Sequence, residues 1–97
     1  MGKKRHRLKI VYDILKAIHD RNNVILHTHI LYKANLSYPV LQDYLQELIV
    51  KHLIEEKLMH KKRMYSLTDK GFEYLQKYSM IDDFTDMFGL SATEESG

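Results

Sequence analysis

The sequence contains no cysteine and no tryptophan, and its 97 residues include only one proline and four glycines. Without cysteine the chain has no disulfide framework, no thiolate nucleophile and no cysteine-ligated zinc site, which suits a reducing compartment such as the cytoplasm. Apolar runs are short, and none approaches the roughly 18 residues that a membrane-spanning helix needs. The composition therefore predicts one globular domain with no membrane partner.

Signatures of an enzyme are missing as well. The sequence has no glycine-rich phosphate loop, no metal-ligand motif and no nucleophile spaced with a base. The acidic pairs 55–56 and 82–83 are adjacent, and adjacent side chains of a strand or helix point in different directions, so neither forms a catalytic dyad. His27 and His29 suggest a metal, but the other four histidines are scattered, and a packing or capping role fits His29 better. We expect no enzyme, no metal and no cofactor.

The net charge of +2 conceals an uneven distribution. Residues 1–70 hold 14 Lys and Arg against 7 Asp and Glu, whereas residues 71–97 hold one basic residue against six acidic ones. The net charges of these two parts are +7 and −5. Each short basic run could be ordinary solvated surface, but the asymmetry favours a binding face plus a separate segment with another role. The basic residues gather in two clusters, Lys3, Lys4, Arg5, Arg7 and Lys9, and Lys57, Lys61, Lys62 and Arg63.

Apolar spacing predicts three helices in the first half of the chain. The first covers residues 7–20, and its apolar stripe is wide enough to pack on more than one side. The short apolar run 24–26 follows, as a small strand or an extended linker. Thr28 is the expected N-cap of a short helix over about residues 29–34. After a tight turn at Asn35, Ser37 caps a third helix that has proline in its first turn.

The second half predicts a hairpin and a last helix. Residues 54–58 and 64–67 are typical of two short strands, and Tyr65 and Leu67 share a face of the second. The link 59–63 contains no Gly, Asn or Pro, so its turn signal is weak. Thr68 is the expected cap of a helix over about residues 69–88, which ends at glycine. Two helices joined by a tight turn and followed by a basic hairpin make a winged helix-turn-helix unit.

Several runs of the sequence resemble the archaeal winged helix-turn-helix DNA-binding domains, a family of predicted transcriptional regulators and small crenarchaeal chromatin-type proteins. The runs are residues 28–38, 53–55 and 65–71, together with Tyr44, Leu45 and Leu48. The resemblance covers about residues 7–78. It implies a winged-helix fold, DNA binding without a cofactor and often dimerisation through the C-terminal helix. One departure is His52, which stands where such domains usually have a left-handed glycine.

We therefore expect a mainly α fold with a small β-hairpin, namely a winged helix-turn-helix with a long C-terminal dimerisation helix. Residues 1–7 form a basic arm, 8–70 the winged helix-turn-helix domain, 71–89 the C-terminal helix and 90–97 a disordered tail. The expected partner is double-stranded DNA, bound by a cytoplasmic, nucleoid-associated regulator or chromatin protein. The alternative is a winged-helix module that binds another protein and never touches DNA.

The third helix carries no Lys or Arg to read guanine, so we expect modest sequence specificity. Gln42 and Gln46 could read adenine, and Ser37 and Tyr38 lie at the positive helix N-terminus where phosphates bind. The basic arm and the wing supply most of the affinity. The predicted DNA-binding residues are Lys3, Lys4, Arg5, Arg7, Ser37, Tyr38, Gln42, Gln46, Lys61, Lys62 and Arg63.

The last helix carries an apolar stripe that is too long for a small domain to cover. A 20-residue helix spans roughly 30 Å, and a symmetric partner is the simplest cover for the stripe, the alternative being that it folds back on its own domain. We expect a homodimer and favour an antiparallel pairing, although the orientation stays open. The predicted interface consists of Tyr74, Tyr78, Ile81, Phe84, Met87 and Phe88.

Overall fold

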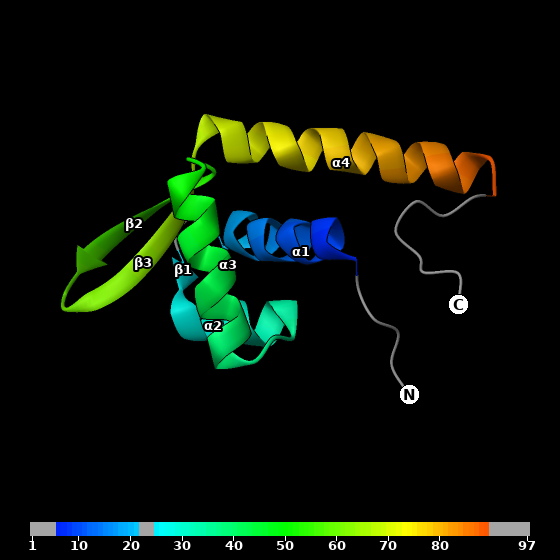
Figure 1. The fold of residues 1–97 in the computed structure, drawn as a ribbon. Coiled ribbons are helices and arrows are strands. Elements are labelled where there is room, and N and C mark those ends of the chain that lie inside the picture. The colour runs from blue at the N-terminus through cyan, green and yellow to red at the C-terminus, as the bar shows by residue number, and fades with distance from the viewer. Residues whose placement is uncertain (1–5, 22–24, 90–97) are drawn as a thin grey trace.

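A computed structural model describes residues 6–21 and 25–89 of the chain. Four helices pack together and a small sheet lies at one side of them, which confirms the expected fold class (Figure 1). The predicted tail and all of the predicted arm before His6 and Arg7 lie outside the described residues. The elements in chain order are α1 (Arg7–Asp20), β1 (Ile25–Leu26), α2 (His27–Ala34), α3 (Tyr38–Val50), β2 (Ile54–Met59), β3 (Lys62–Leu67) and α4 (Asp69–Met87).

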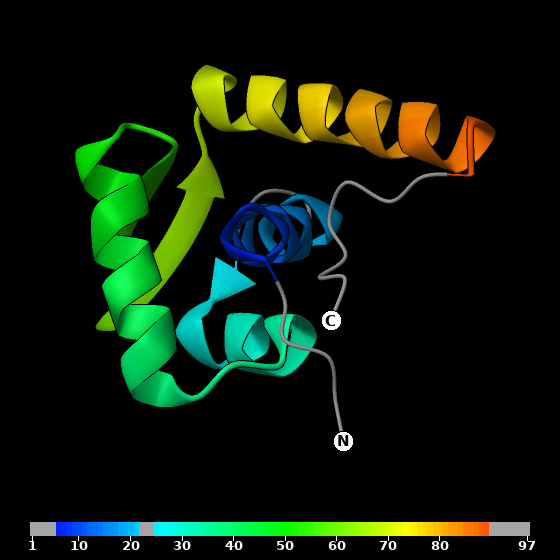
Figure 2. The ribbon, with the colours of Figure 1, turned by 45° about the vertical axis from the view of Figure 1, so that its right-hand side comes forward.

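Helix α1 lies at the centre of the fold. Figure 2 looks almost along its axis and shows α2, α3 and α4 arranged around it. Ile14, Leu15 and Ile18 are completely buried, as the wide apolar stripe predicts. They pack with Ile30 of α2, with Leu41 and Leu45 of α3, and with residues of β2, β3 and α4 in one hydrophobic core. Truncating one of these aliphatic side chains to alanine typically costs about 2–5 kcal/mol.

The sheet has the strand order β1-β3-β2, and both pairings are antiparallel. The apolar run after α1 is therefore a strand, since Ile25 pairs with Tyr65 of β3. Ile54 lies opposite Leu67 at one end of the hairpin and Met59 opposite Lys62 at the other. Tyr65 and Leu67 are both buried, which confirms the expected alternation.

Two local predictions need correction. Helix α2 begins at His27, so Thr28 lies inside its first turn and is not its N-cap. The reason is that pairing with β3 fixes the chain as far as Leu26, and the helix starts directly after it. The hairpin link is shorter than the sequence suggests, because only His60 and Lys61 separate the strands. Both residues have positive φ, 52° and 63°, as a two-residue type I′ turn requires.

The helix ends agree better with the sequence. His52 has a φ of 63°, so it adopts the left-handed conformation for which glycine is usual. The amides of His52 and Leu53 donate to the carbonyls of Ile49 and Leu48, which closes α3 with a Schellman motif. Asn35 ends α2 with a similar φ of 56°. The Thr68 hydroxyl accepts from the Gly71 amide at the start of α4, as predicted, and Gly89 with a φ of 70° follows its end.

The start of α4 is joined closely to the end of α3. The Thr68 hydroxyl donates to the His52 carbonyl at 2.6 Å, and the Thr68 amide donates to the Leu53 carbonyl at 3.2 Å. A Cβ on Gly71 would lie only 2.3 Å from the Leu53 carbonyl oxygen. Glycine is therefore required here by close backbone approach.

Among the described helices, none is long and apolar enough to cross a membrane.

Candidate nucleic-acid interface

The outer face of α3 has little charge. Tyr38, Val40, Asp43 and Gln46 are exposed along it, whereas Gln42 is half-buried. Ser37 is the N-cap residue by position, but its hydroxyl makes no capping hydrogen bond to this helix. The predicted residues of α3 thus lie on one accessible surface, with Gln46 the more accessible of the two glutamines.

An ion pair modifies this surface. The Arg7 guanidinium donates to the Glu47 carboxylate and lies over the Tyr44 ring at 5.6 Å from its centroid. Lys51 Nζ lies 3.4 Å from the same Glu47 oxygen. The hydrogen bond from Arg7 lowers the pKa of Glu47, and the same contact raises the pKa of Arg7. Glu47 therefore stays ionised, and the cations of Arg7 and Lys51 compensate its charge, so it repels phosphate less than its sequence position suggests.

The structure places Arg7, the last residue of the predicted arm, in a helix. Arg7 is the first residue of α1 and is paired with α3, whereas Lys3, Lys4 and Arg5 lie outside the described residues. The sequence carries no signal for the contact with Glu47, because the two residues are 40 positions apart. Arg7 is consequently placed beside α3 by tertiary packing.

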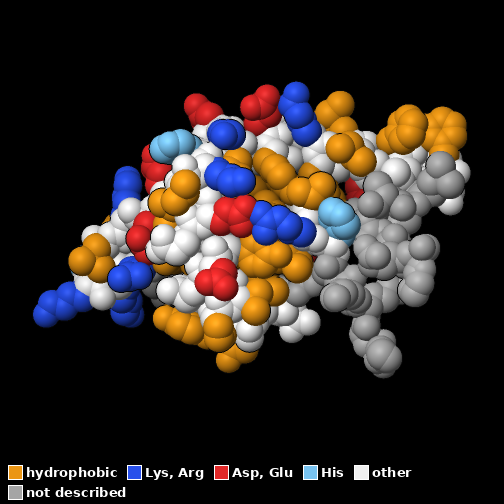
Figure 3. Space-filling view, viewed as in Figure 1, with side chains coloured by type: hydrophobic (Ala, Val, Ile, Leu, Met, Phe, Trp, Pro, Cys, Tyr) orange, Lys and Arg blue, Asp and Glu red, His pale blue; other side chains and the backbone are white. Residues whose placement is uncertain are grey.

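Exposed basic residues gather at the tip of the wing, which is the hairpin of β2 and β3. Lys61 occupies the turn, and Lys62 and Arg63 begin β3. Arg63 Nη1 lies 3.6 Å from a Glu56 oxygen, so part of its charge is compensated within the hairpin. Figure 3 shows Lys and Arg side chains projecting at this end of the molecule. The wing tip can therefore carry positive charge away from the domain core.

Sequence reasoning missed two exposed residues near the helix-turn-helix turn. Tyr32 is 86% exposed near the end of α2, and Lys33 beside it is exposed as well. The position of a tyrosine in a helical pattern does not by itself show whether its side chain faces solvent or the core. The only signal was the position of Lys33 immediately before the turn at Asn35.

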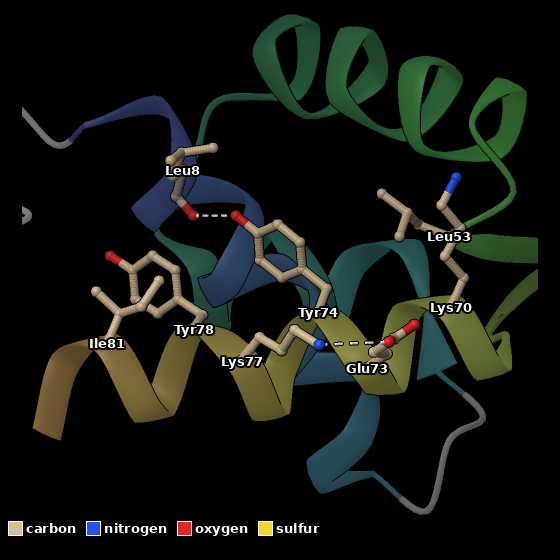
Figure 4. A pocket seen from close by; sticks show the side chains of 8 residues that line it. All are labelled: Leu8, Leu53, Lys70, Glu73, Tyr74, Lys77, Tyr78 and Ile81. Carbon is tan, nitrogen blue, oxygen red and sulfur yellow. Dashed lines mark hydrogen bonds and ion pairs between the residues drawn. The ribbon is translucent and has the colours of Figure 1, made fainter. Parts of the chain in front are cut away.

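The predicted dimer stripe divides into two parts. The Tyr74 hydroxyl donates to the Leu8 carbonyl at 2.8 Å, and burial is the main cause that raises the pKa of Tyr74 to about 12. Tyr78 is buried, and its ring stacks on Tyr12 at 4.7 Å between centroids. Both tyrosines therefore pack on α1 within the chain (Figure 4). The exposed part of the stripe consists of Ile81 (53%), Phe84 (58%), Met87 (77%) and Phe88 (60%).

An apolar cavity of about 310 Å³ lies beside the two tyrosines, between the start of α1, the end of α3 and the side of α4 (Figure 4). Lys77 at its rim lies 3.6 Å from Glu73. In the part of the chain that the structure describes, no group of three or more His, Asp or Glu is arranged to hold a metal ion. The cavity is lined by Leu8, Leu53, Lys70, Glu73, Tyr74, Lys77, Tyr78 and Ile81.

The fold, the order of its elements and the hairpin wing define the class of the protein. Residues 4–86 match the winged helix-turn-helix family, and the chain belongs to that family. It is 32% identical over 79 residues to the uncharacterized protein MJ0290 of Methanocaldococcus jannaschii. The match covers 80% of this chain but only 34% of MJ0290, so the chain spans about a third of that relative's length.

Solved structures share the fold at lower identity. Sso10a-2, a DNA-binding protein from Sulfolobus solfataricus, aligns with a TM-score of 0.75 at 23% identity, over 88% of this chain and 87% of its own. F93 from STIV, a winged-helix DNA-binding protein, aligns with a TM-score of 0.69 at 21% identity, over 87% and 95%. TubR from Bacillus thuringiensis, bound to 24 bp of tubC, aligns with a TM-score of 0.66 at 20% identity, over 74% and 81%.

Proposed function

We infer that the chain binds double-stranded DNA as a homodimer, with modest sequence specificity, as a transcriptional regulator or a chromatin-associated protein. The observation that carries this proposal is the basic wing tip of Lys61, Lys62 and Arg63, projecting from a winged helix-turn-helix fold. The printed descriptions of Sso10a-2 and F93 as DNA-binding proteins, and of TubR as bound to DNA, support it. This function is non-enzymatic and belongs in the cytoplasm, at the nucleoid.

In this proposal α3 enters the major groove. Its 13 residues are about 20 Å long, and the major groove is about 12 Å wide and admits a helix. Gln42 and Gln46 contact base edges, while Ser37 and Tyr38 contact phosphates at the helix N-terminus. The wing tip and the arm residues Lys3, Lys4 and Arg5 contact the backbone. Specificity stays modest because α3 has no Lys or Arg for guanine.

The homodimer is supported by the exposed apolar end of α4. Contiguous exposed apolar surface on a small domain usually marks an interface. The four residues Ile81, Phe84, Met87 and Phe88 are each more than half exposed, and Figure 3 shows hydrophobic side chains gathered over this end of the helix. A dimer presents two recognition helices to successive major grooves, roughly 34 Å apart.

A salt titration of DNA binding tests the nucleic-acid part of the proposal. Affinity for a labelled random-sequence duplex is measured by fluorescence anisotropy over a series of salt concentrations. Each phosphate contact contributes about −0.9 to the slope of log K against log salt. Lys61→Ala/Lys62→Ala removes two contacts from each wing of the homodimer, so the slope should become shallower by about 3.6. Arg63 is left intact because Glu56 compensates part of its charge.

The matched control is Lys16→Ala/Arg21→Ala, which removes the same charge from two exposed positions, Lys16 in the C-terminal half of α1 and Arg21 directly after the helix. This control should keep the parent slope. A flat slope in the parent, or equal losses in both double variants, would refute the proposal that the wing binds DNA. If the parent binds no duplex at all, the result favours a protein-interaction module.

A mass measurement tests the homodimer. Phe84→Asp places a charge at the centre of the exposed stripe, and we expect a monomer by analytical ultracentrifugation. Tyr32→Asp is the matched control, because Tyr32 is the most exposed aromatic residue of the described chain and lies on α2. It should keep the parent mass. A dimer that survives Phe84→Asp would exclude α4 as the interface.

A further inference from the structure

The apolar cavity beside Tyr74 and Tyr78 has the size of a small-molecule site. Its walls come from three parts of the chain (Figure 4). Leu8 belongs to α1, Leu53 follows α3, and the two tyrosines and Ile81 belong to α4. The volume of about 310 Å³ lies at the lower end of the range of small-molecule pockets. Such pockets are mostly apolar and carry a few polar groups that orient the ligand.

The two tyrosines give the cavity an aromatic wall. Their rings are nearly parallel, with 6.1 Å between centroids and 13° between planes, and Tyr12 stacks on Tyr78 at 4.7 Å. The Tyr74 hydroxyl donates to the Leu8 carbonyl at 2.8 Å, and burial is the main cause that raises the pKa of Tyr74 to about 12. This ring is therefore uncharged at pH 7 and fixed in place. A further ring can stack on such a wall at about the same spacing, which favours a flat aromatic ligand over an aliphatic one.

Two lysines of α4 stand at the rim of the cavity. Lys77 Nζ lies 3.6 Å from a Glu73 oxygen, so these two charges compensate one another. Lys70 Nζ donates to the Lys51 carbonyl at 3.1 Å. A carbonyl is a neutral acceptor, so this bond holds the ammonium at the rim without removing its charge, and an ammonium has two further N–H donors. The charged groups of the lining, two lysines and one glutamate, therefore carry a net charge of +1.

The charged groups next to the rim have the same net sign. Arg7 directly precedes Leu8, and Lys51 holds Lys70 through its carbonyl. Arg7 and Lys51 share one carboxylate, that of Glu47, so this group also has a net charge of +1. Figure 3 shows Lys and Arg side chains bordering an apolar area on this face of the molecule. An anion that approaches the cavity therefore meets a positive potential, and a cation is repelled.

We propose that this cavity is a binding site for a small aromatic monocarboxylate. The ring of the ligand lies between Leu8, Leu53 and the tyrosine wall, and its carboxylate accepts a hydrogen bond from the Lys70 ammonium. One negative charge balances the net charge of the lining. All the lining residues belong to one chain, so the proposal depends neither on DNA binding nor on the homodimer.

The site lies where α3 and α4 are joined. The Leu53 amide donates to the Leu48 carbonyl at 2.9 Å in the motif that closes α3, and the Leu53 carbonyl accepts from the Thr68 amide at the start of α4. A ligand that contacts Leu53 therefore bears on the joint between the two helices. Because the lining is assembled only in the folded chain, ligand binding should also raise the melting temperature.

Isothermal titration calorimetry with three probes tests the proposal. Cinnamate is an aromatic monocarboxylate, cinnamyl alcohol has the same ring without the charge, and octanoate has the charge without the ring. Cinnamate should bind with one site per chain. The alcohol should bind about tenfold more weakly, since it lacks a hydrogen bond between charged groups. Octanoate should bind several-fold more weakly than cinnamate, since it cannot stack on the tyrosines.

Three variants locate the site. Lys70→Met removes the ammonium but keeps an apolar stem, so the affinity for cinnamate should fall about tenfold while that for cinnamyl alcohol stays unchanged. Leu8→Phe places a ring in the cavity and should abolish the binding of both, and because Leu8 is 50% exposed the fold should tolerate it. Lys16→Met is the matched control, because Lys16 lines a different hollow between α1 and α4. It should bind cinnamate as the parent does.

Each remaining outcome overturns the proposal. Equal affinities for cinnamate and its alcohol, or an unchanged affinity in Lys70→Met, would exclude the contact between the carboxylate and the ammonium. Binding that survives Leu8→Phe, or that is lost in Lys16→Met, would place the ligand outside this cavity. Loss of binding as the protein concentration rises would show that another copy of the chain occupies the cavity. A parent chain that binds none of the probes would exclude the site.

Discussion

The two halves of α4 carry the same apolar periodicity but meet different surroundings. In the first half Leu75 and Tyr78 are buried against the core and α1. In the second half Phe84 and Met87 face solvent. An amphipathic stripe therefore indicates that a helix face is buried, but it does not indicate which surface packs against it.

The difference follows from helix length. Helix α1 has 14 residues and is about 21 Å long, whereas α4 has 19 residues and is about 28 Å long. The two helices cross so that Phe72 near the start of α4 contacts His19 near the end of α1. Because α1 begins at Arg7, it has no further turn to lie under the last turns of α4 (Figure 1).

The largest effect on stability is expected from truncating a side chain in the first half of α4, which packs on the core. Leu75→Ala should lower the free energy of unfolding by about 2–4 kcal/mol, because it opens a cavity in the core. Met87→Ala, in the exposed second half of α4, should change the free energy of unfolding by no more than about 0.5 kcal/mol in the monomer. Urea unfolding at a low and a high protein concentration measures both, and equal losses at low concentration would break the comparison.

Substituting two glycines by alanine should have the next largest effects on stability. Gly71→Ala pushes a Cβ against the backbone of Leu53 and should cost about 1–3 kcal/mol, since the helix start must shift. Gly89→Ala meets nothing within 4 Å and pays only for its left-handed φ, about 1 kcal/mol. Thermal unfolding should rank the first variant below the second. The reverse order would mean that α4 is not held at its N-terminal end.

A smaller effect is expected from removing one hydrogen bond between the first half of α4 and α1. Tyr74→Phe removes the hydroxyl that donates to the Leu8 carbonyl and should lower stability by about 1 kcal/mol. Tyr32→Phe removes a hydroxyl from an exposed ring and should have no measurable effect. Chemical denaturation of the two variants compares them directly. Identical midpoints would show that the contact between α1 and α4 does not depend on this bond.

The last test concerns the dependence of stability on alkaline pH. Burial is the main cause that raises the pKa of Tyr65 and of Tyr74 to about 12, from a usual value of 10. The folded chain then holds more protons than the unfolded chain between these values, so stability is complete below pH 10 and falls as the pH rises toward 12. Absorbance titration of tyrosinate should show one late group fewer in Tyr74→Phe than in the parent. The same number of late groups in both would contradict the assignment.

Much of the fold follows from local signals in the sequence. The helix-turn-helix order, the caps at Thr68 and Gly89 and the left-handed residues at Asn35 and His52 are each set by short-range chemistry. The start of α2 and the two-residue turn at His60 and Lys61 are exceptions. Both depend on strand pairing, because β3 must align with β1 on one side and β2 on the other before these positions are defined.

The candidate site was less predictable than the fold. The sequence indicates a basic wing and an α3 without Lys or Arg, but it does not indicate that Arg7, 40 positions away, forms an ion pair with Glu47. Nor does it indicate that Tyr32 is exposed and Tyr78 buried, since both are tyrosines on helices. Exposure depends on which elements pack together, and the local pattern records only that one face of each helix is apolar.

By itself, the sequence determined the secondary elements, their order, the polarity of each helix face and the separation of positive from negative charge along the chain. These follow from side-chain chemistry at spacings of a few residues. Only the tertiary structure decided how the stripe of α4 is divided, with Tyr74 and Tyr78 against α1 and Phe84 and Phe88 left to solvent. The physical reason is that coverage of a face depends on the length and placement of the neighbouring helix, which are properties of the packed chain.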